Sequence, residues 1–184
     1  RSDKVYNPSI EETNARLVWK TSGGDPALTI KAFPKQRSLM MKERDLLRGL
    51  MRYNDALEAI RCFPYSIRMF SIHSYQSFVW NSMATERVKR YGLRPVVGDL
   101  YLNETCSEDG VVRVVKDASQ VGIDQIVLPL PGYSVQYPSN EIGECYRSIL
   151  HEDGIDLSNK DPIPEATAKG SYRKLMQRVS NLRW

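Results

Sequence analysis

The sequence has few cysteines and histidines and lacks the motifs of several common enzyme classes. Its 184 residues include two histidines and three cysteines, Cys62, Cys106 and Cys145, which lie far apart and form no CxxC pair. This usage argues against a structural zinc and for a reducing compartment. A phosphate-binding glycine-rich loop, a nucleophile elbow and an HExxH motif are also missing. We therefore predict no metal site, and these residues alone do not define the catalytic site of an enzyme.

Long hydrophobic runs are missing as well. No run approaches 18 apolar residues, so we predict no membrane span. Hydrophobic residues at 41% and charged residues at 26% are typical of a soluble globular protein. The length suits one domain with a substantial core. The chain starts at Arg1 rather than Met and shows no leader, so we expect it to be a piece of a longer protein.

Positive charge is concentrated in the first half of the sequence. The net charge is +4, but residues 1–94 carry 17 Lys and Arg against 9 Asp and Glu, whereas residues 95–184 carry 9 against 13. The first half is thus +8 and the second −4. A basic half can bind a polyanion such as RNA or DNA, because neutralised phosphates release counterions. A solvated helical surface would give the same composition.

One long helix is predicted from Ser66 to Gly92, a stretch without proline whose single glycine is the last residue. Ser66 is a suitable N-cap, and Gly92 follows a basic last turn. On a 3.6-residue period, His73, Gln76 and Trp80 share a face, with Ser74, Ser77 and Asn81 beside it. These polar groups predict either a buried network that fixes the helix or a polar surface facing a ligand or another domain.

The remaining pattern predicts an α+β fold with a helical first half and a small, mostly antiparallel sheet. Helical segments are expected from about 7 to 20, after Asp25-Pro26, after Ser38, and after an Asn54 cap. Strands are expected at 96–102, 111–116, 123–130 and 172–184, with a helix at about 139–151. Residues 156–169 are predicted to form a mobile loop. We expect Met40, Met41 and Met51 to fill gaps in a helical core, and Asp99 to be a turn residue rather than a catalyst.

Several segments, taken in order, resemble the TruD-type pseudouridine synthases, in a eukaryote-like form. The residues HSYQSFVWN (73–81), followed by Val97-Gly98-Asp99-Leu100, are similar to a block of that family. The later turn Pro129-Leu130-Pro131-Gly132, the pair Gly143-Glu144 and the segment Gly170-Ser171-Tyr172-Arg173-Lys174 agree with it in order and spacing.

The resemblance implies a fragment of an enzyme that isomerises uridine to pseudouridine in RNA without a cofactor. The family's catalytic aspartate and its NYFG-type segment precede the matched block, and neither has a counterpart here. Residues 1–169 would form the TRUD insertion-type domain and 170–184 the return into the catalytic domain. The fragment would be inactive alone, and its partners would be RNA, above all tRNA, and the catalytic domain of the same chain. A nuclear location, or another intracellular one, is also expected.

Two groups of residues are candidates for function. The cations expected to contact the RNA backbone are Arg68, Arg87, Lys89, Arg90 and Arg94, with Lys35 and Arg37 as additions. The residues expected to organise the domain or its junction with the catalytic half are His73, Gln76, Asn81, Tyr172 and Arg173. Two alternatives remain open: a non-enzymatic α+β interaction domain and an RNA-binding module that belongs to no enzyme.

Overall fold

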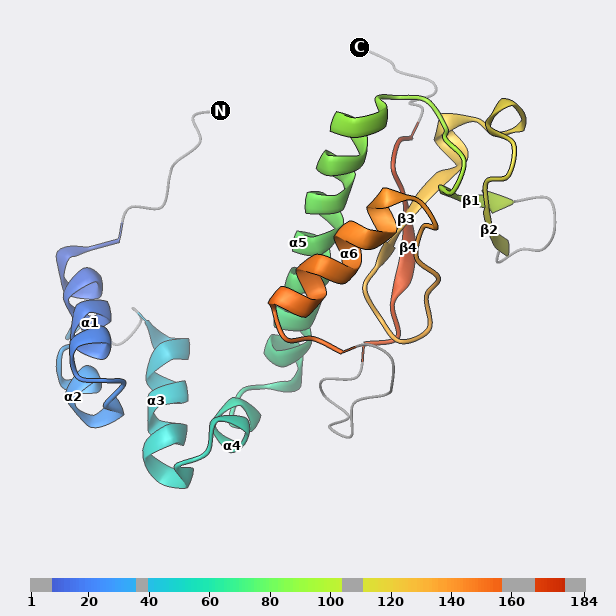
Figure 1. Ribbon diagram of the computed structural model, residues 1–184. Coiled ribbons are helices and arrows are strands. Elements are labelled where there is room, and N and C mark those ends of the chain that lie inside the picture. Colours follow the sequence, from blue (N-terminus) through green and yellow to red (C-terminus); the bar gives the residue numbers. More distant parts are fainter. Residues whose placement is uncertain (1–7, 36–39, 104–110, 157–167, 178–184) are drawn as a thin grey trace, which may run out of the picture. The chain divides into compact units, whose positions relative to one another are not determined.

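The computed structural model describes residues 8–35, 40–103, 111–156 and 168–177. The chain divides into two compact units, Arg1–Phe70 and Ser71–Trp184. The boundary lies within the helix α5 (Tyr65–Tyr91), which continues from one unit into the other (Figure 1). The domain boundary predicted between residues 169 and 170 stays a prediction.

The first unit contains the helices α1 (Ile10–Thr21), α2 (Pro26–Lys31), α3 (Met41–Tyr53) and α4 (Ala56–Arg61). Ser9 and Glu12 form a reciprocal capping box at the start of α1. Asp25 caps α2. The predicted cap of α4 is wrong by one residue, because the Asp55 side chain accepts from Glu58 N. Asn54 instead ends α3, in the left-handed region at φ 50°.

A small core joins the first three helices. It is built on Ala15, Phe33 and Leu47, which are buried. Gly49 lets α3 approach α4, because a Cβ there would lie closer than 3.0 Å to the Ala59 backbone. Of the three methionines predicted to fill a helical core, Met40 packs against this one. The prediction is wrong for Met41 and Met51, since both side chains are exposed.

The helix α5 agrees with the predicted Ser66–Gly92 segment to within one residue at each end. It starts earlier than predicted, because the Pro64 carbonyl already accepts from the N–H groups of Ile67 and Arg68. Gly92 follows it at φ +67°, as a C-terminal glycine should. The helix is unbroken at Ser74.

The buried face of α5 is only partly apolar. Phe70 and Phe78, two large apolar side chains of this helix, are 67% and 57% exposed. The buried side chains of the helix are Gln76, Val79, Met83 and Arg87. These recur at intervals of three and four residues, so two polar side chains share the inward face with two apolar ones.

The second unit holds a four-stranded antiparallel sheet in the order β2-β1-β3-β4. Its strands are β1 (Leu100–Asn103), β2 (Val111–Val114), β3 (Ile126–Leu130) and β4 (Ser171–Lys174). They are shorter than predicted: the chain before β1 is a turn, and the short 3₁₀ helices η1 (Ala118–Gln120) and η2 (Ile123–Gln125) precede β3. Most of the loop predicted to be mobile, residues 157–167, lies outside the described residues.

The helices α5 and α6 (Glu141–Glu152) pack on this sheet (Figure 1). Their shared core contains Val79 and Met83 of α5, Leu128 of β3, and Ile142 and Tyr146 of α6. The Tyr146 hydroxyl, fully buried, donates to the Pro129 carbonyl at 2.8 Å. The architecture is thus helices followed by a small antiparallel sheet, which confirms the α+β prediction.

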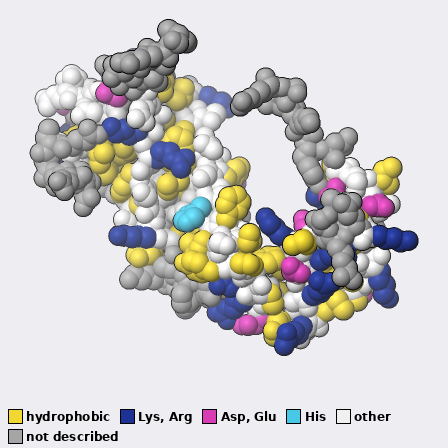
Figure 2. Space-filling model, turned by 180° about the vertical axis from the view of Figure 1, so that it is seen from behind, with side chains coloured by type: hydrophobic (Ala, Val, Ile, Leu, Met, Phe, Trp, Pro, Cys, Tyr) yellow, Lys and Arg dark blue, Asp and Glu magenta, His cyan; other side chains and the backbone are white. Residues whose placement is uncertain are grey.

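Apolar side chains also reach the surface, where Figure 2 shows them among Lys and Arg side chains. None of the helices in the described residues combines the length of a membrane span with enough apolar character to cross a bilayer. A surface of this mixed kind is ordinary for a globular protein.

Candidate functional site

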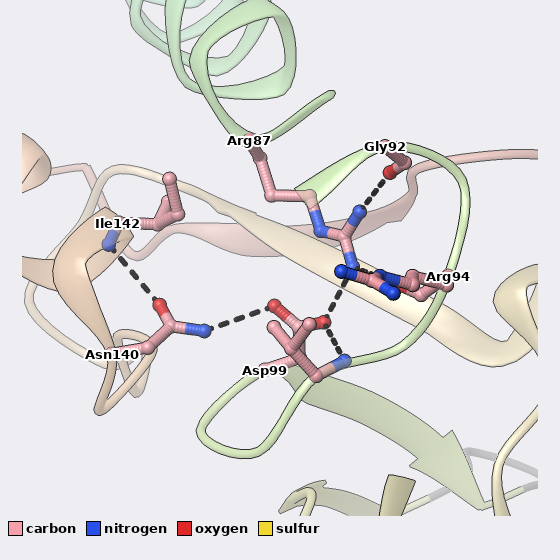
Figure 3. A network of polar contacts seen from close by, with 7 residues as sticks. Arg87, Gly92, Arg94, Asp99, Asn140 and Ile142 are labelled. Atoms are coloured by element: carbon pink, nitrogen blue, oxygen red, sulfur yellow. Dashed lines mark hydrogen bonds and ion pairs between the residues drawn. The ribbon is translucent and has the colours of Figure 1, made fainter. Parts of the chain in front are cut away.

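A buried ion pair lies where α5 ends. Arg87 is fully buried, and its Nη2 donates to Oδ2 of Asp99 at 2.7 Å and to the Arg94 carbonyl at 2.5 Å. Its Nη1 donates to the Gly92 carbonyl. Figure 3 shows the guanidinium reaching from the helix end into the loop that leads to β1. The cation therefore sits against three acceptors from the segment that follows its own helix.

The carboxylate of Asp99 uses both oxygens. Oδ2 also accepts from Val96 N at 3.0 Å, and Oδ1 accepts from Nδ2 of Asn140 at 3.1 Å. Asn140 in turn caps α6, because its Oδ1 accepts from Ile142 N at 3.1 Å (Figure 3). One carboxylate thus joins the end of α5, the following loop and the start of α6. The carboxylate is fully buried and both of its oxygens are bonded, which suits a structural role rather than proton transfer.

This geometry corrects the sequence prediction for Arg87. A side chain that is fully buried and bonded to Asp99 cannot reach an RNA phosphate, so Arg87 leaves the set of candidate contacts. The basic last turn of the helix was interpreted as a set of exposed cations. A buried cation in that turn gives the same sequence pattern. Asp99 does follow a turn, at Gly98 with φ +90°, but its burial as the partner of Arg87 went unpredicted. The Gly98-Asp99 pair was the sequence feature that could have drawn attention to Asp99.

The polar residues of α5 differ in burial and in their contacts. Gln76 is buried: its Nε2 donates to the Pro131 carbonyl at 2.7 Å, and its Oε1 lies 2.9 Å from Nδ1 of His73. Nε1 of Trp80 donates to the Leu128 carbonyl at 3.2 Å. His73 itself and Asn81 are exposed. Gln76 and Trp80 therefore attach α5 to β3 and to the turn after it.

The turn after β3 and the start of β4 are in close contact. Tyr133 N and Ser134 N donate to the carbonyls of Ala168 and Lys169, both at 3.0 Å. A Cβ on Gly132 would lie closer than 3.0 Å to the backbone of Gly170, so only glycine fits at this crossing. The sequence segments that carry the family resemblance therefore meet in one frame, which consists of the helices α5 and α6 and the four-stranded sheet.

The two junction candidates on β4 face opposite sides of the sheet, as neighbours in a strand must. The Tyr172 hydroxyl accepts from Gln136 N at 2.5 Å. Arg173 is exposed, and its guanidinium carbon lies 5.2 Å from the centre of the Trp80 ring. Tyr172 therefore contacts the segment between β3 and α6, and Arg173 contacts α5.

The other candidate cations differ in how far their charge is already paired. Arg90 bonds to Glu86 at 2.8 Å and to Glu141 at 2.6 Å. The bond from Arg90 lowers the pKa of Glu86, and the bonds to Glu86 and then Glu141 raise the pKa of Arg90. Lys89 and Arg94 are exposed. Arg90 is thus less available to a ligand than these two neighbours.

Arg68 and the two additional cations belong to the first unit. Nη1 of Arg68 donates to the Arg61 carbonyl at 2.9 Å, and its guanidinium lies 5.8 Å from the Tyr65 ring. Lys35 is exposed, and Arg37 lies outside the described residues. Arg68 therefore has contacts within the N-terminal end of α5 and the helix before it.

A tyrosine–carboxylate contact that the sequence did not predict joins the two helices of the second unit. The Tyr75 hydroxyl donates to Oδ2 of Asp153, at the end of α6, at 2.7 Å. Burial, followed by this bond, raises the pKa of Tyr75. The two residues are 78 positions apart, and no local pattern marks either one. The described residues contain no group of three or more His, Cys, Asp or Glu that could hold a metal ion.

Comparison with known proteins gives consistent matches. A family model described as tRNA pseudouridine synthase D (TruD) matches residues 4–183. The pseudouridylate synthase 7 homolog of Bos taurus is 38% identical over 176 residues, which cover 92% of this chain and 25% of that protein. The multisubstrate pseudouridine synthase 7 of Schizosaccharomyces pombe is 32% identical, and the match covers 98% of this chain and 31% of that protein.

A solved structure has a similar fold. It is the crystal structure of a protein from Methanosarcina mazei described as a TruD-type tRNA pseudouridine synthase, with a TM-score of 0.68 and 25% sequence identity. The similarity covers 95% of this chain and 43% of that one. The chain spans about a quarter of the length of the mammalian relatives it matches.

Proposed function

This chain belongs to the TruD family of pseudouridine synthases, and on that premise we propose that it is part of an enzyme that isomerises uridine to pseudouridine in RNA. The observation that carries the proposal is the meeting of the family-like segments in one frame. Gln76 and Trp80 bond to the backbone of β3 and the turn after it, and that turn crosses the start of β4 at Gly132. These contacts join residues between 38 and 55 positions apart in the sequence, so they require the matched segments together and not one local motif.

The role proposed for this chain is to position RNA and to support the catalytic domain. Lys89 and Arg94, exposed near the end of α5, are candidates for phosphate contacts in the second unit. Arg68 supplies a further candidate in the first unit. Such contacts fix the position of an RNA and carry no base specificity. Transfer RNA is the first substrate class to test, because the family description names it.

The catalytic carboxylate is proposed to lie in another part of the polypeptide. The reaction needs a carboxylate at the ribosyl or uracil carbon and a base turned out into a pocket. Asp99, which is fully buried, is bonded on both oxygens, so it does not meet that need. We therefore expect the chain alone to be inactive.

Pseudouridine mapping tests the proposal. The full-length protein that contains this chain should convert uridine in an unmodified tRNA transcript, and the chain alone should give only background. Failure of the full-length protein on tRNA and on other cellular RNAs would refute the enzymatic function. Conversion by the chain alone would instead show that the catalytic group lies within these 184 residues.

A further inference from the structure

An exposed arginine on β4 is held in place by an aromatic ring. The guanidinium carbon of Arg173 lies 5.2 Å from the centre of the Trp80 ring, within the range of a cation–π contact. Arg173 stands opposite Leu128 in the sheet, so both point toward the side on which α5 packs. The Trp80 indole is itself fixed, because its Nε1 donates to the Leu128 carbonyl. The guanidinium is therefore positioned by a ring that the fold holds still.

The hydrogen-bond donors of this guanidinium are unused within the described part of the chain. There, Arg173 forms no ion pair and no side-chain hydrogen bond, whereas Arg90 and Arg147 are each bonded to a carboxylate. Arg113 on β2 is the useful comparison: it is exposed, and among the described residues it has neither an ion pair nor a cation–π contact. A cation already held in one orientation loses less conformational entropy when it binds.

The local charge favours an anionic partner. Residues 168–177 contain Lys169, Arg173 and Lys174 and no acidic residue. Leu128, which stands opposite Arg173, is apolar, and β3 contains no acidic residue. A planar guanidinium with free N–H groups matches the oxygens of a phosphate, to which it can donate two parallel hydrogen bonds.

We propose that Arg173, held by Trp80, binds a backbone phosphate of the RNA and so positions the substrate. This inference rests on the proposed function, because it assumes that RNA is the ligand. It assigns to Arg173 a contact with the RNA rather than a junction with the catalytic domain alone. A carboxylate from another segment of the polypeptide could accept the same hydrogen bonds, and the experiment below separates the two.

The test compares Arg173→Met with Arg113→Met in the full-length protein. Arg173→Met should raise the Kd for an unmodified tRNA transcript on the order of tenfold, the usual effect of losing one charge-assisted hydrogen bond. The slope of log affinity against log salt should become shallower by about 0.7–0.9, corresponding to one phosphate contact. KM should rise with kcat unchanged, because the contact is made equally in the ground and transition states. Arg113→Met should change these values much less.

Arg173→Lys provides a second variant that keeps the charge and the ring contact. It should retain the salt slope but lose part of the affinity, because a lysine ammonium cannot donate the paired hydrogen bonds. Equal losses for Arg173→Met and Arg113→Met would overturn the assignment, since only net charge would then matter. A lower Tm with unchanged RNA titrations would overturn it too, by showing a carboxylate partner. Wild-type protein that neither binds nor converts RNA would refute the proposed function itself.

Discussion

Replacing Asp99 with asparagine tests whether the buried ion pair holds the end of α5, the loop before β1 and the start of α6 together. Oδ2 accepts from Arg87 and from Val96 N, and Oδ1 accepts from Asn140. An asparagine amide would place its NH₂ group against a donor in either orientation. It would also leave the Arg87 cation fully buried with no opposite charge beside it.

The expected loss is large compared with the stability of a typical domain. Removing one partner of a buried ion pair costs about 3–5 kcal/mol, whereas whole domains unfold with about 5–15 kcal/mol. For a chain of this length, each kcal/mol lowers Tm by about 2–4 °C, so Asp99→Asn should lower it by roughly 6–20 °C. Thermal unfolding followed by circular dichroism measures the change, and urea unfolding gives the free energy.

Two further variants make the result specific. Glu144→Gln removes an exposed carboxylate of α6 that pairs with Arg147, and it should leave Tm close to the wild-type value. The double variant Arg87→Met, Asp99→Asn removes the buried cation as well, and it should lose less than the sum of the two single losses. If the Tm of Asp99→Asn were the same as that of Glu144→Gln, the structural role of Asp99 would be refuted.

Three other substitutions test the frame around this ion pair. Tyr146→Phe should cost about 1–3 kcal/mol, because it leaves the buried Pro129 carbonyl without its donor. Burial also raises the pKa of Tyr146 above that of an unfolded tyrosine. The free energy of unfolding should therefore keep its full Tyr146 contribution below about pH 10 and decrease as the pH rises further. This decrease should be weaker in Tyr146→Phe. Gly143→Ala places a Cβ closer than 3.0 Å to the Pro138 carbonyl and should lower the free energy of urea unfolding by about 1–3 kcal/mol. An unchanged urea midpoint would show that the first turn of α6 can shift. Gln76→Met should lower Tm by leaving the Pro131 carbonyl unbonded, and an equal Tm would mean that water replaces the amide.

The elements that sequence predicted well are those with strong local signals. The helix α5 lacks internal proline and ends at a glycine, and both of its ends were predicted to within one residue. The change from helical periodicity to β-branched runs after Gly92 predicted the sheet, because valine and isoleucine pack well on a pleated surface. The strands were predicted too long, since a β-branched run does not show where pairing with a neighbour stops.

The inward face of α5 could not be predicted in the same way. Phe70 and Phe78 are the larger apolar side chains, yet the helix turns Gln76 and Arg87 toward the sheet. Both polar groups have acceptors in this frame: the Pro131 carbonyl bonds Gln76, and Asp99 bonds Arg87. Hydrophobicity alone ranks these residues in the opposite order. Their burial depends on partners 55 and 12 residues away, which only the completed topology brings close.

The residues that carry the family resemblance are, in this structure, mainly contacts of the frame. Gln76 and Trp80 bond to carbonyls of β3 and its turn, and Gly132 permits the close approach of β4. Substitutions at these positions should therefore reduce activity of the full-length protein together with its Tm. A residue that contacts RNA should instead change KM and the salt dependence while Tm stays the same. Measuring Tm and KM together thus distinguishes the two kinds of residue, and we expect the second result for Arg173.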